Sequence, residues 1–256
     1  MFVRCPKCSH QPLPADQSLP AACPSCGVIL AKVAHQAAQG GLPSRSPARA
    51  SGVVQIDRET SWRALLLHVP ERVDSTLFWG RAALLAVFAI WSLWLMTRSV
   101  ADGEMAQSFI HGPLLVFHEA GHVLFMPLGQ WMTVVGGALT QCLMPLVLGA
   151  ALLWKNRDPF GAAFALWLLG VSVMDIAPYT YDALHPQLTL LGGGTGEDGS
   201  HDFIFLLDSV GLRHRAQWLG LLLHKLGAAL MLLALGWAAR LLLLQRGRRA
   251  GVVLRE

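Results

Sequence analysis

One long apolar stretch limits what this chain can fold into more than any other feature of the sequence. Residues 105–154 contain no Lys, Arg or Asp, and Glu119 is their only formally charged side chain. Over the whole chain 54% of residues are hydrophobic and 14% are charged, whereas soluble domains carry about 25% charged residues. A bilayer admits such segments as helices, whose backbone polar groups pair internally. We therefore predict an all-α polytopic membrane protein.

Hydropathy and helix-breaking residues divide the apolar part into about four to six membrane helices. Helices are expected at 77–96, 109–128, 138–154, from about 160 to 175 or slightly beyond, and at 217–245. The joint at 130–137 is rich in β-branched residues and glycine, which favours a short extended or re-entrant piece.

Basic residues gather at the two ends of the apolar part and in its short loops. This distribution is typical of cytoplasmic flanks, so it accounts for the net charge of +4 without a nucleic-acid partner. Five full spans would place the arginine-rich C-terminal segment and the 155–158 loop outside the cell. If helix 109–128 is re-entrant, both basic segments lie inside, and we prefer this topology for a protein of the cytoplasmic (inner) membrane.

The N-terminal segment carries four cysteines in two CxxC pairs separated by fourteen residues: Cys5, Cys8, Cys23 and Cys26. This spacing suits one tetrahedral zinc site. Disulfides are the alternative, but no secretory signal is visible in the first thirty residues, which favours thiolates in a reducing compartment. We predict a zinc ribbon at 1–33 in the cytoplasm, with a structural Zn²⁺ that supplies folding energy and a surface that recruits a cytosolic protein.

The remaining boundaries follow from composition. Residues 34–60 are small, polar and rich in Pro and Gly, which predicts a flexible linker. Residues 61–76 form a juxtamembrane segment, either an amphipathic surface helix or a plain linker. Residues 77–250 make up the membrane-embedded domain.

A possible catalytic motif lies inside the apolar stretch, where residues 118–122 read His-Glu-Ala-Gly-His. In a helix His118 and His122 lie on one face and can bind one Zn²⁺, while Glu119 acts as general base on the attacking water. Two core histidines beside an unpaired carboxylate would be a costly alternative. A catalytic zinc needs a third protein ligand and an open position.

Two downstream stretches offer that ligand. The first, 175–183, reads DIAPYTYDA and contains Asp175 and Asp182. The second is the pair His201 and Asp202, which follows a glycine-rich turn. His201 is the alternative third ligand, and Asp202 is a candidate for orienting a ligand from outside the coordination sphere. A solvated loop pair is an equally good interpretation of these two residues.

These motifs resemble the site-2 protease class of intramembrane zinc metalloproteases, the M50 peptidases, in a branch with an N-terminal zinc ribbon. That family pairs a membrane HExxH with a later Asn-x-x-Pro…Leu-Asp-Gly segment whose Asp binds zinc. The nearest match here, Asp175-x-x-Pro178-x-x-x-Asp182, implies that Asp182 is the third ligand and that Asp175 takes the place of the Asn as an orienting residue. The match departs from the family in having Asp for Asn, Ala183 for Gly and a spacing one residue shorter.

Motif and resemblance together predict an intramembrane zinc metalloendopeptidase. It would use a catalytic Zn²⁺ and cleave a membrane-embedded protein within the lipid bilayer. Two alternatives stay open: a catalytically inactive membrane scaffold or sensor that binds metal, and a zinc hydrolase of lipid-derived amides.

Overall fold

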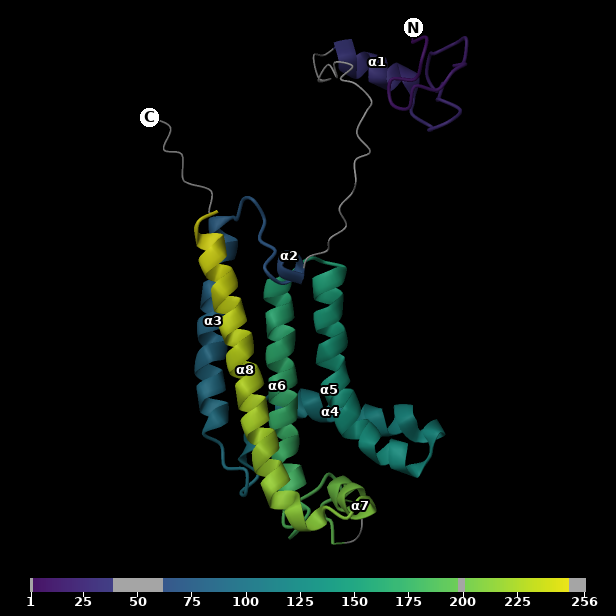
Figure 1. The fold of residues 1–256 in the computed structure, drawn as a ribbon. Coiled ribbons are helices and arrows are strands. Elements are labelled where there is room, and N and C mark those ends of the chain that lie inside the picture. The colour runs from purple at the N-terminus through teal and green to yellow at the C-terminus, as the bar shows by residue number, and fades with distance from the viewer. Residues whose placement is uncertain (1, 39–61, 198–200, 249–256) are drawn as a thin grey trace. The chain divides into compact units, whose positions relative to one another are not determined.

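The computed structural model describes residues 2–38, 62–197 and 201–248. Within these residues the chain is helical, and its β-structure consists of one isolated antiparallel bridge between Ala22 and Ile29. The expected all-α class is therefore confirmed for the described part. The chain divides into two units, Met1–Arg58 and Glu59–Glu256, and each is described by itself (Figure 1).

The first unit is built around its cysteines. Cys5 and Cys23 are buried and pack with Leu30, the first residue of helix α1 (Leu30–Ala38). Helix α1 continues past residue 33, so regular structure extends into the beginning of the expected linker. Residues 39–60 of that linker lie outside the described residues.

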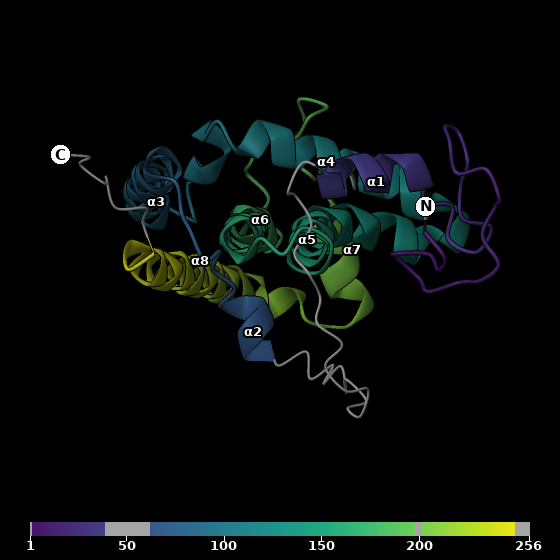
Figure 2. The same ribbon diagram turned by 90° about the horizontal axis from the view of Figure 1, so that it is seen from above.

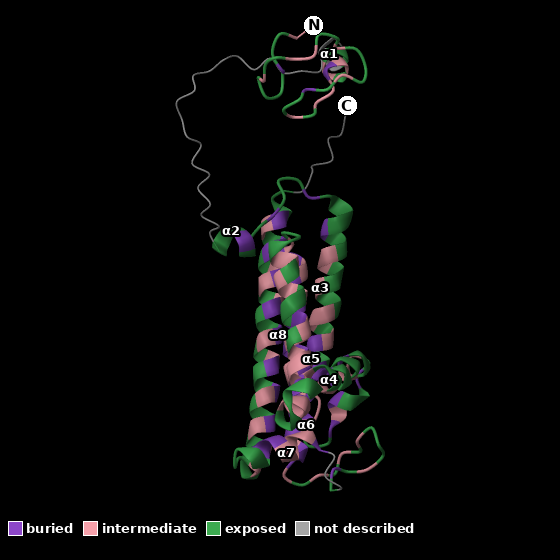
Figure 3. Cartoon of the chain, turned by 90° about the vertical axis from the view of Figure 1, so that its right-hand side faces the viewer, coloured by how far each residue is buried: buried purple, intermediate pink, exposed green. Residues whose placement is uncertain are grey.

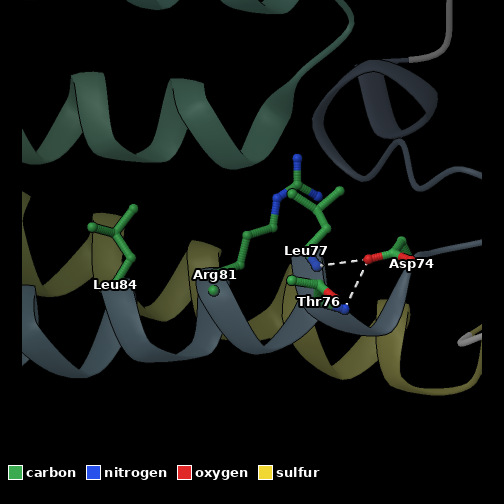
Figure 4. Close-up of a pocket in the computed structure, with 6 residues that line it drawn as sticks. Asp74, Thr76, Leu77, Arg81 and Leu84 are labelled. Carbon is green, nitrogen blue, oxygen red and sulfur yellow. Dashed lines mark hydrogen bonds between the residues drawn. The ribbon is translucent and has the colours of Figure 1, made fainter.

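The juxtamembrane segment contains only a short helix, α2 (Trp62–Leu66), before the first long helix, α3 (Ser75–Met96). Asp74 fixes the start of α3, because its Oδ1 accepts hydrogen bonds from the backbone N–H groups of Thr76 (2.8 Å) and Leu77 (3.1 Å) (Figure 4). The cap adds two residues to the expected 77–96.

Four helices in the described residues are long and apolar enough to cross a membrane, which indicates an integral membrane protein. They are α3, α5 (Gln130–Trp154), α6 (Pro159–Asp182) and the segment Arg213–Arg246, most of which is α8 (Ala216–Arg246). The helix with the HExxH motif, α4 (His111–Phe125), has 15 residues, whereas a full crossing needs about 20.

Helix α6 lies in the middle of the membrane domain, between α8 and α5, and α3 packs on α8 (Figures 1 and 2). Glycines allow α6 and α8 to approach closely. A Cβ atom on Gly170 would lie 2.8 Å from the carbonyl oxygen of Gly227, and one on Gly227 would lie 2.6 Å from that of Gly170. Residues of α6 are mostly buried, whereas exposed residues run along the length of α3 (Figure 3).

The joint between α4 and α5 does not contain the expected extended piece. Residues 130–137 are the first turns of α5, preceded by a single 3-10 turn, Met126–Leu128. The glycines in this segment serve helix packing: a Cβ on Gly136 would lie 2.7 Å from the carbonyl oxygen of Gly121 on α4. Close helix contact, not the propensity of β-branched residues, therefore decides the local structure.

Several basic loops and helix ends meet at one end of the membrane domain. Arg81 near the start of α3 pairs with Asp158 between α5 and α6 at 3.3 Å, and the Arg248 guanidinium beyond α8 donates to the carbonyl of Val69. The segments 97–110 and 183–197 lie at the other end, together with a helix that the sequence did not predict, α7 (Asp202–Ser209) (Figure 1).

Candidate metal centre

Helix α4 presents one face to a cavity of about 890 Å³. Figure 2 shows that α4 lies across the long helices and not along them. Five residues of α4 line the cavity at helical spacing: His111, Leu115, His118, Glu119 and His122. The HExxH motif is therefore at a cavity wall inside the membrane domain.

One carboxylate oxygen lies between the two imidazoles of the motif. Asp202 Oδ2 is 3.0 Å from His118 Nε2 and 3.3 Å from His122 Nε2. In a tetrahedral zinc site, bonds of about 2.0 Å place neighbouring ligand atoms about 3.3 Å apart. The two distances to Asp202 Oδ2 are thus close to the separation of neighbouring ligands around one metal ion. A Glu119 carboxylate oxygen lies within 4.8 Å of both histidine ligand atoms.

The other nitrogen of each imidazole faces a hydrogen-bond acceptor. His122 Nδ1 lies 2.9 Å from the carbonyl oxygen of Thr133, and His118 Nδ1 lies 3.1 Å from Gln141 Oε1. Each Nδ1 therefore carries a proton and donates it. This arrangement directs the two Nε2 atoms to the position beside Asp202.

A polar network continues from His118 into the core. The Gln141 amide donates through Nε2 to Asp175 Oδ2 at 2.9 Å, and His111 Nδ1 lies 2.8 Å from Asp175 Oδ1. Asp175 thus lies behind His118, connected to it through Gln141.

A glycine on α5 leaves the space that the metal centre needs. A Cβ atom on Gly137 would lie 2.6 Å from His118 Nε2 and 2.7 Å from His122 Cε1. Any larger residue at 137 would therefore press on the metal-facing edge of both rings.

The structure does not bring Asp182 or His201 to the histidine pair. Asp182, at the end of α6, accepts hydrogen bonds at Oδ1 from the backbone N–H groups of Gln187 (2.8 Å) and Leu188 (3.1 Å). His201 Nε2 lies 3.4 Å from Asp182 Oδ2. Asp182 therefore holds the chain that follows α6 at Gln187 and Leu188, and it lies beside His201. Asp202 takes the place at the histidines that was expected for Asp182.

Tyr179 connects His201 with the centre. Its hydroxyl accepts a hydrogen bond from the backbone N–H of Asp202 at 3.0 Å, and its ring packs on His201 with centroids 4.1 Å apart. Tyr179 therefore helps to hold Asp202 beside the two imidazoles.

Three residues of the site were absent from the sequence-based set: His111, Gln141 and Tyr179. Two of them could have been identified from the sequence. His111 precedes His118 by seven residues, which places both on one helix face, and Gln141 is a polar residue in an apolar helix. Tyr179 has no such signal, because its role depends on contacts with α7.

The rest of the cavity wall is mostly apolar. Leu115, Val134 and Ile176 line it from three helices, and Leu188 and Leu190 close it from the loop after α6. The cavity therefore combines one polar centre with walls that suit hydrocarbon groups.

The four cysteines of the first unit form a second group that could hold a metal ion, with sulfurs within 4.8 Å of one another. The Cys5–Cys26 and Cys8–Cys23 sulfurs lie 3.7 Å apart. Burial raises the pKa of Cys5, but backbone N–H groups of Lys7 and Cys8 outweigh it and lower the pKa to about 6. The thiolate form is thereby favoured at Cys5. At Cys26 a backbone hydrogen bond from Val28 lowers the pKa, but burial and the three other thiols outweigh it and raise the pKa to about 12.

A functional assignment for this chain depends on the geometry of the two candidate metal groups. Comparisons with protein-family models, with curated proteins and with solved structures found no match.

Proposed function

We propose that this chain is an intramembrane zinc metalloendopeptidase of the site-2 protease kind. The observation that carries the proposal is the position of Asp202 Oδ2, 3.0 and 3.3 Å from the Nε2 atoms of an HExxH pair, in a cavity of a membrane domain. His118, His122 and Asp202 would be the three protein ligands, and the fourth position would face the cavity.

The chemistry follows from the residues around that position. Zinc, when bound, would polarise the carbonyl of the scissile amide and make an attacking water more acidic. Glu119 lies beside the histidines and accepts a proton from the attacking water. The same carboxyl group then delivers the proton to the leaving nitrogen. The hydrogen bonds from both Nδ1 atoms hold the imidazoles in place during these steps.

The shape of the cavity supports a peptide substrate in extended form. His111 and His122 are eleven positions apart on α4, or about 16 Å of helix, which matches about five residues of an extended chain. A membrane helix hides its peptide bonds, so a substrate segment would have to unwind before it could lie along α4.

The outer surface of the α4–α5 hairpin supports a location within lipid. Large apolar side chains are exposed along it, namely Val116, Val123, Leu124, Met126 and Leu128. Because α4 is too short for a full crossing, we propose that α4 and the 3-10 turn after it form a re-entrant element embedded in the bilayer, whereas α5 crosses it.

The test is turnover by the purified full-length protein in detergent, offered peptides from membrane helices and, in parallel, lipid-derived amides. We expect peptide cleavage that falls by about 10²- to 10⁴-fold in Glu119→Gln, because the proton acceptor is lost while the volume is kept. Zinc content should stay at the wild-type level in that variant.

Three contrary outcomes would each reject part of the proposal, and two of them would favour another function. Cleavage of amide lipids but not peptides would favour the lipid hydrolase, whose acyl chain the apolar walls would also admit. Zinc binding with no turnover on either substrate class would favour a scaffold or sensor. Peptide cleavage that is unchanged in Glu119→Gln would contradict the mechanism.

For the first unit we propose a structural Zn²⁺ bound by Cys5, Cys8, Cys23 and Cys26, since four thiolates leave no open coordination position. We further propose that this unit lies in the cytoplasm and recruits a cytosolic protein.

A further inference from the structure

We infer that Gln141 and Asp175 are positioning residues, which together determine which nitrogen of His118 faces the metal. The inference rests on the proposed function in one respect, namely that His118 binds zinc through Nε2. It adds a cause for that choice of nitrogen, because a neutral imidazole can carry its proton on either one.

Asp175 determines which groups donate and which accept in this hydrogen-bond network. Its side chain is 5% exposed, and both oxygens are engaged, Oδ1 by His111 and Oδ2 by Gln141. An ionised carboxylate only accepts hydrogen bonds, so both neighbours must donate to it. A buried carboxylate is stable only with such partners. The His111 imidazole supplies one of them and is itself partly open to the cavity.

Gln141 then has one favourable orientation. Its Nε2 faces two acceptors, Asp175 Oδ2 at 2.9 Å and the carbonyl oxygen of Ser172 at 3.5 Å. If the amide were turned around, its oxygen would face both acceptors without a proton between them. The oxygen Oε1 must therefore face His118.

His118 receives its tautomer from this arrangement. Because Gln141 Oε1 can only accept, Nδ1 of His118 must carry the proton, and the lone pair on Nε2 is left for the metal beside Asp202. His122 obtains the same tautomer from a backbone carbonyl, that of Thr133, which has no alternative orientation. A side-chain amide can turn around, and Asp175 prevents this.

The test measures zinc affinity in the full-length protein by competition with a chelator. In Gln141→Met, which keeps the size but loses the acceptor, we expect zinc at the HExxH site to bind about 10- to 100-fold more weakly. The zinc of the four-cysteine site is an internal reference and should keep its wild-type affinity.

A charge-conserving exchange is the rescue variant. In Gln141→Glu/Asp175→Asn, a Glu carboxylate can accept from His118 Nδ1 and from the Asn amide, while the Asn oxygen accepts from His111. The bond between positions 141 and 175 changes direction, but His118 Nδ1 and His111 Nδ1 still donate to an acceptor. We therefore expect affinity to return close to the wild-type value. Ser92→Ala is the matched control, because it removes a buried hydrogen bond to Trp167 elsewhere in the bundle. It should lower stability but leave zinc affinity unchanged.

A second test determines which nitrogen of His118 is protonated in the wild-type protein. In zinc-loaded protein labelled with ¹⁵N-histidine, His118 should carry its proton on Nδ1, with the signal assigned by its loss in His118→Gln. A proton on Nε2 would overturn the inference even if Gln141→Met failed to fold.

The outcomes separate this inference from the proposed function. Wild-type protein that binds one zinc, at the cysteines only, would contradict the proposed function. Wild-type protein that binds two, with unchanged affinity in Gln141→Met or no recovery in the exchange variant, would overturn the role of Gln141 and Asp175 alone.

Discussion

At the scale of single residues, the metal centre divides into a part that is local in sequence and a part that is not. His118, Glu119 and His122 come from one helical turn, so their spacing alone places them together. Asp202 follows His118 by 84 residues and reaches it only because α7 packs beneath α5 and Tyr179 holds its backbone. The carboxylate that completes the group therefore had to be found in the structure.

The first prediction compares the two candidate carboxylates. We expect Asp202→Ala to lose zinc from the HExxH site. The affinity should fall by more than the roughly 10- to 100-fold that is lost when a residue that only orients a ligand is changed. Asp182→Ala should keep two zinc ions per chain, because Asp182 is bonded to the backbone of Gln187 and Leu188. The measurement is zinc per chain after dialysis against a chelator. Loss of zinc in Asp182→Ala with retention in Asp202→Ala would restore Asp182 as the ligand.

The second prediction concerns the space beside the imidazoles. Gly137→Ala should abolish zinc binding at the HExxH site, because the added methyl group would lie 2.6 Å from His118 Nε2. Gly112→Ala on α4 is the matched control, since a Cβ there meets nothing within 4 Å. Zinc content of both variants checks this, and equal zinc in the two would contradict the geometry.

At the scale of helices, the sequence predicts well where length and hydropathy suffice. The helices expected at 77–96, 109–128 and 217–245 correspond to α3, to α4 with its 3-10 turn, and to α8. The expectation for 130–137 was wrong because glycines that look like breakers are contact points between two helices. Helix α7 was missed because its eight residues are too few for a clear periodic pattern.

The third prediction tests the contact between α6 and α8. Gly170→Ala places a methyl group 2.8 Å from the Gly227 carbonyl oxygen, so we expect destabilisation by about 1–3 kcal/mol, the usual cost of overpacking. Gly236→Ala on α8 has open space around its Cβ and should be neutral or slightly stabilising. Thermal unfolding in detergent measures both, and equal midpoints would show that the helices can separate without cost.

At the scale of the whole membrane domain, one basic cluster and the cavity occupy opposite ends. Arg81, the 155–158 loop and the end of α8 lie together at one end, whereas residues 188–194, which close the cavity, lie at the other (Figure 1). Four crossings and a re-entrant α4 would put the start of α3, the 155–158 loop and the end of α8 on the cytoplasmic side, and the Arg213–Arg215 turn on the other. The cavity would then be nearer the opposite face of the membrane.

The fourth prediction tests this orientation by labelling introduced cysteines in intact cells with a membrane-impermeant thiol reagent. The background is Cys142→Ser, and its own labelling, from the four N-terminal cysteines, is subtracted. We expect Gly192→Cys to be labelled, and Asn156→Cys to be labelled only after the membrane is made permeable. Both positions are exposed, so accessibility depends on the side of the membrane. The reverse pattern would invert the topology and place the cavity near the cytoplasm.

Sequence by itself determined the membrane character, the helical class, the two cysteine pairs and the HExxH group, because each depends on composition or on spacing within a few residues. Tertiary structure alone decided that Asp202 faces the histidines, that Asp182 anchors a loop, and that Gln141 connects His118 to Asp175. The contacts of His118 join residues that are 23 and 84 positions apart in the sequence. Only the packing of helices brings such distant residues within hydrogen-bond distance.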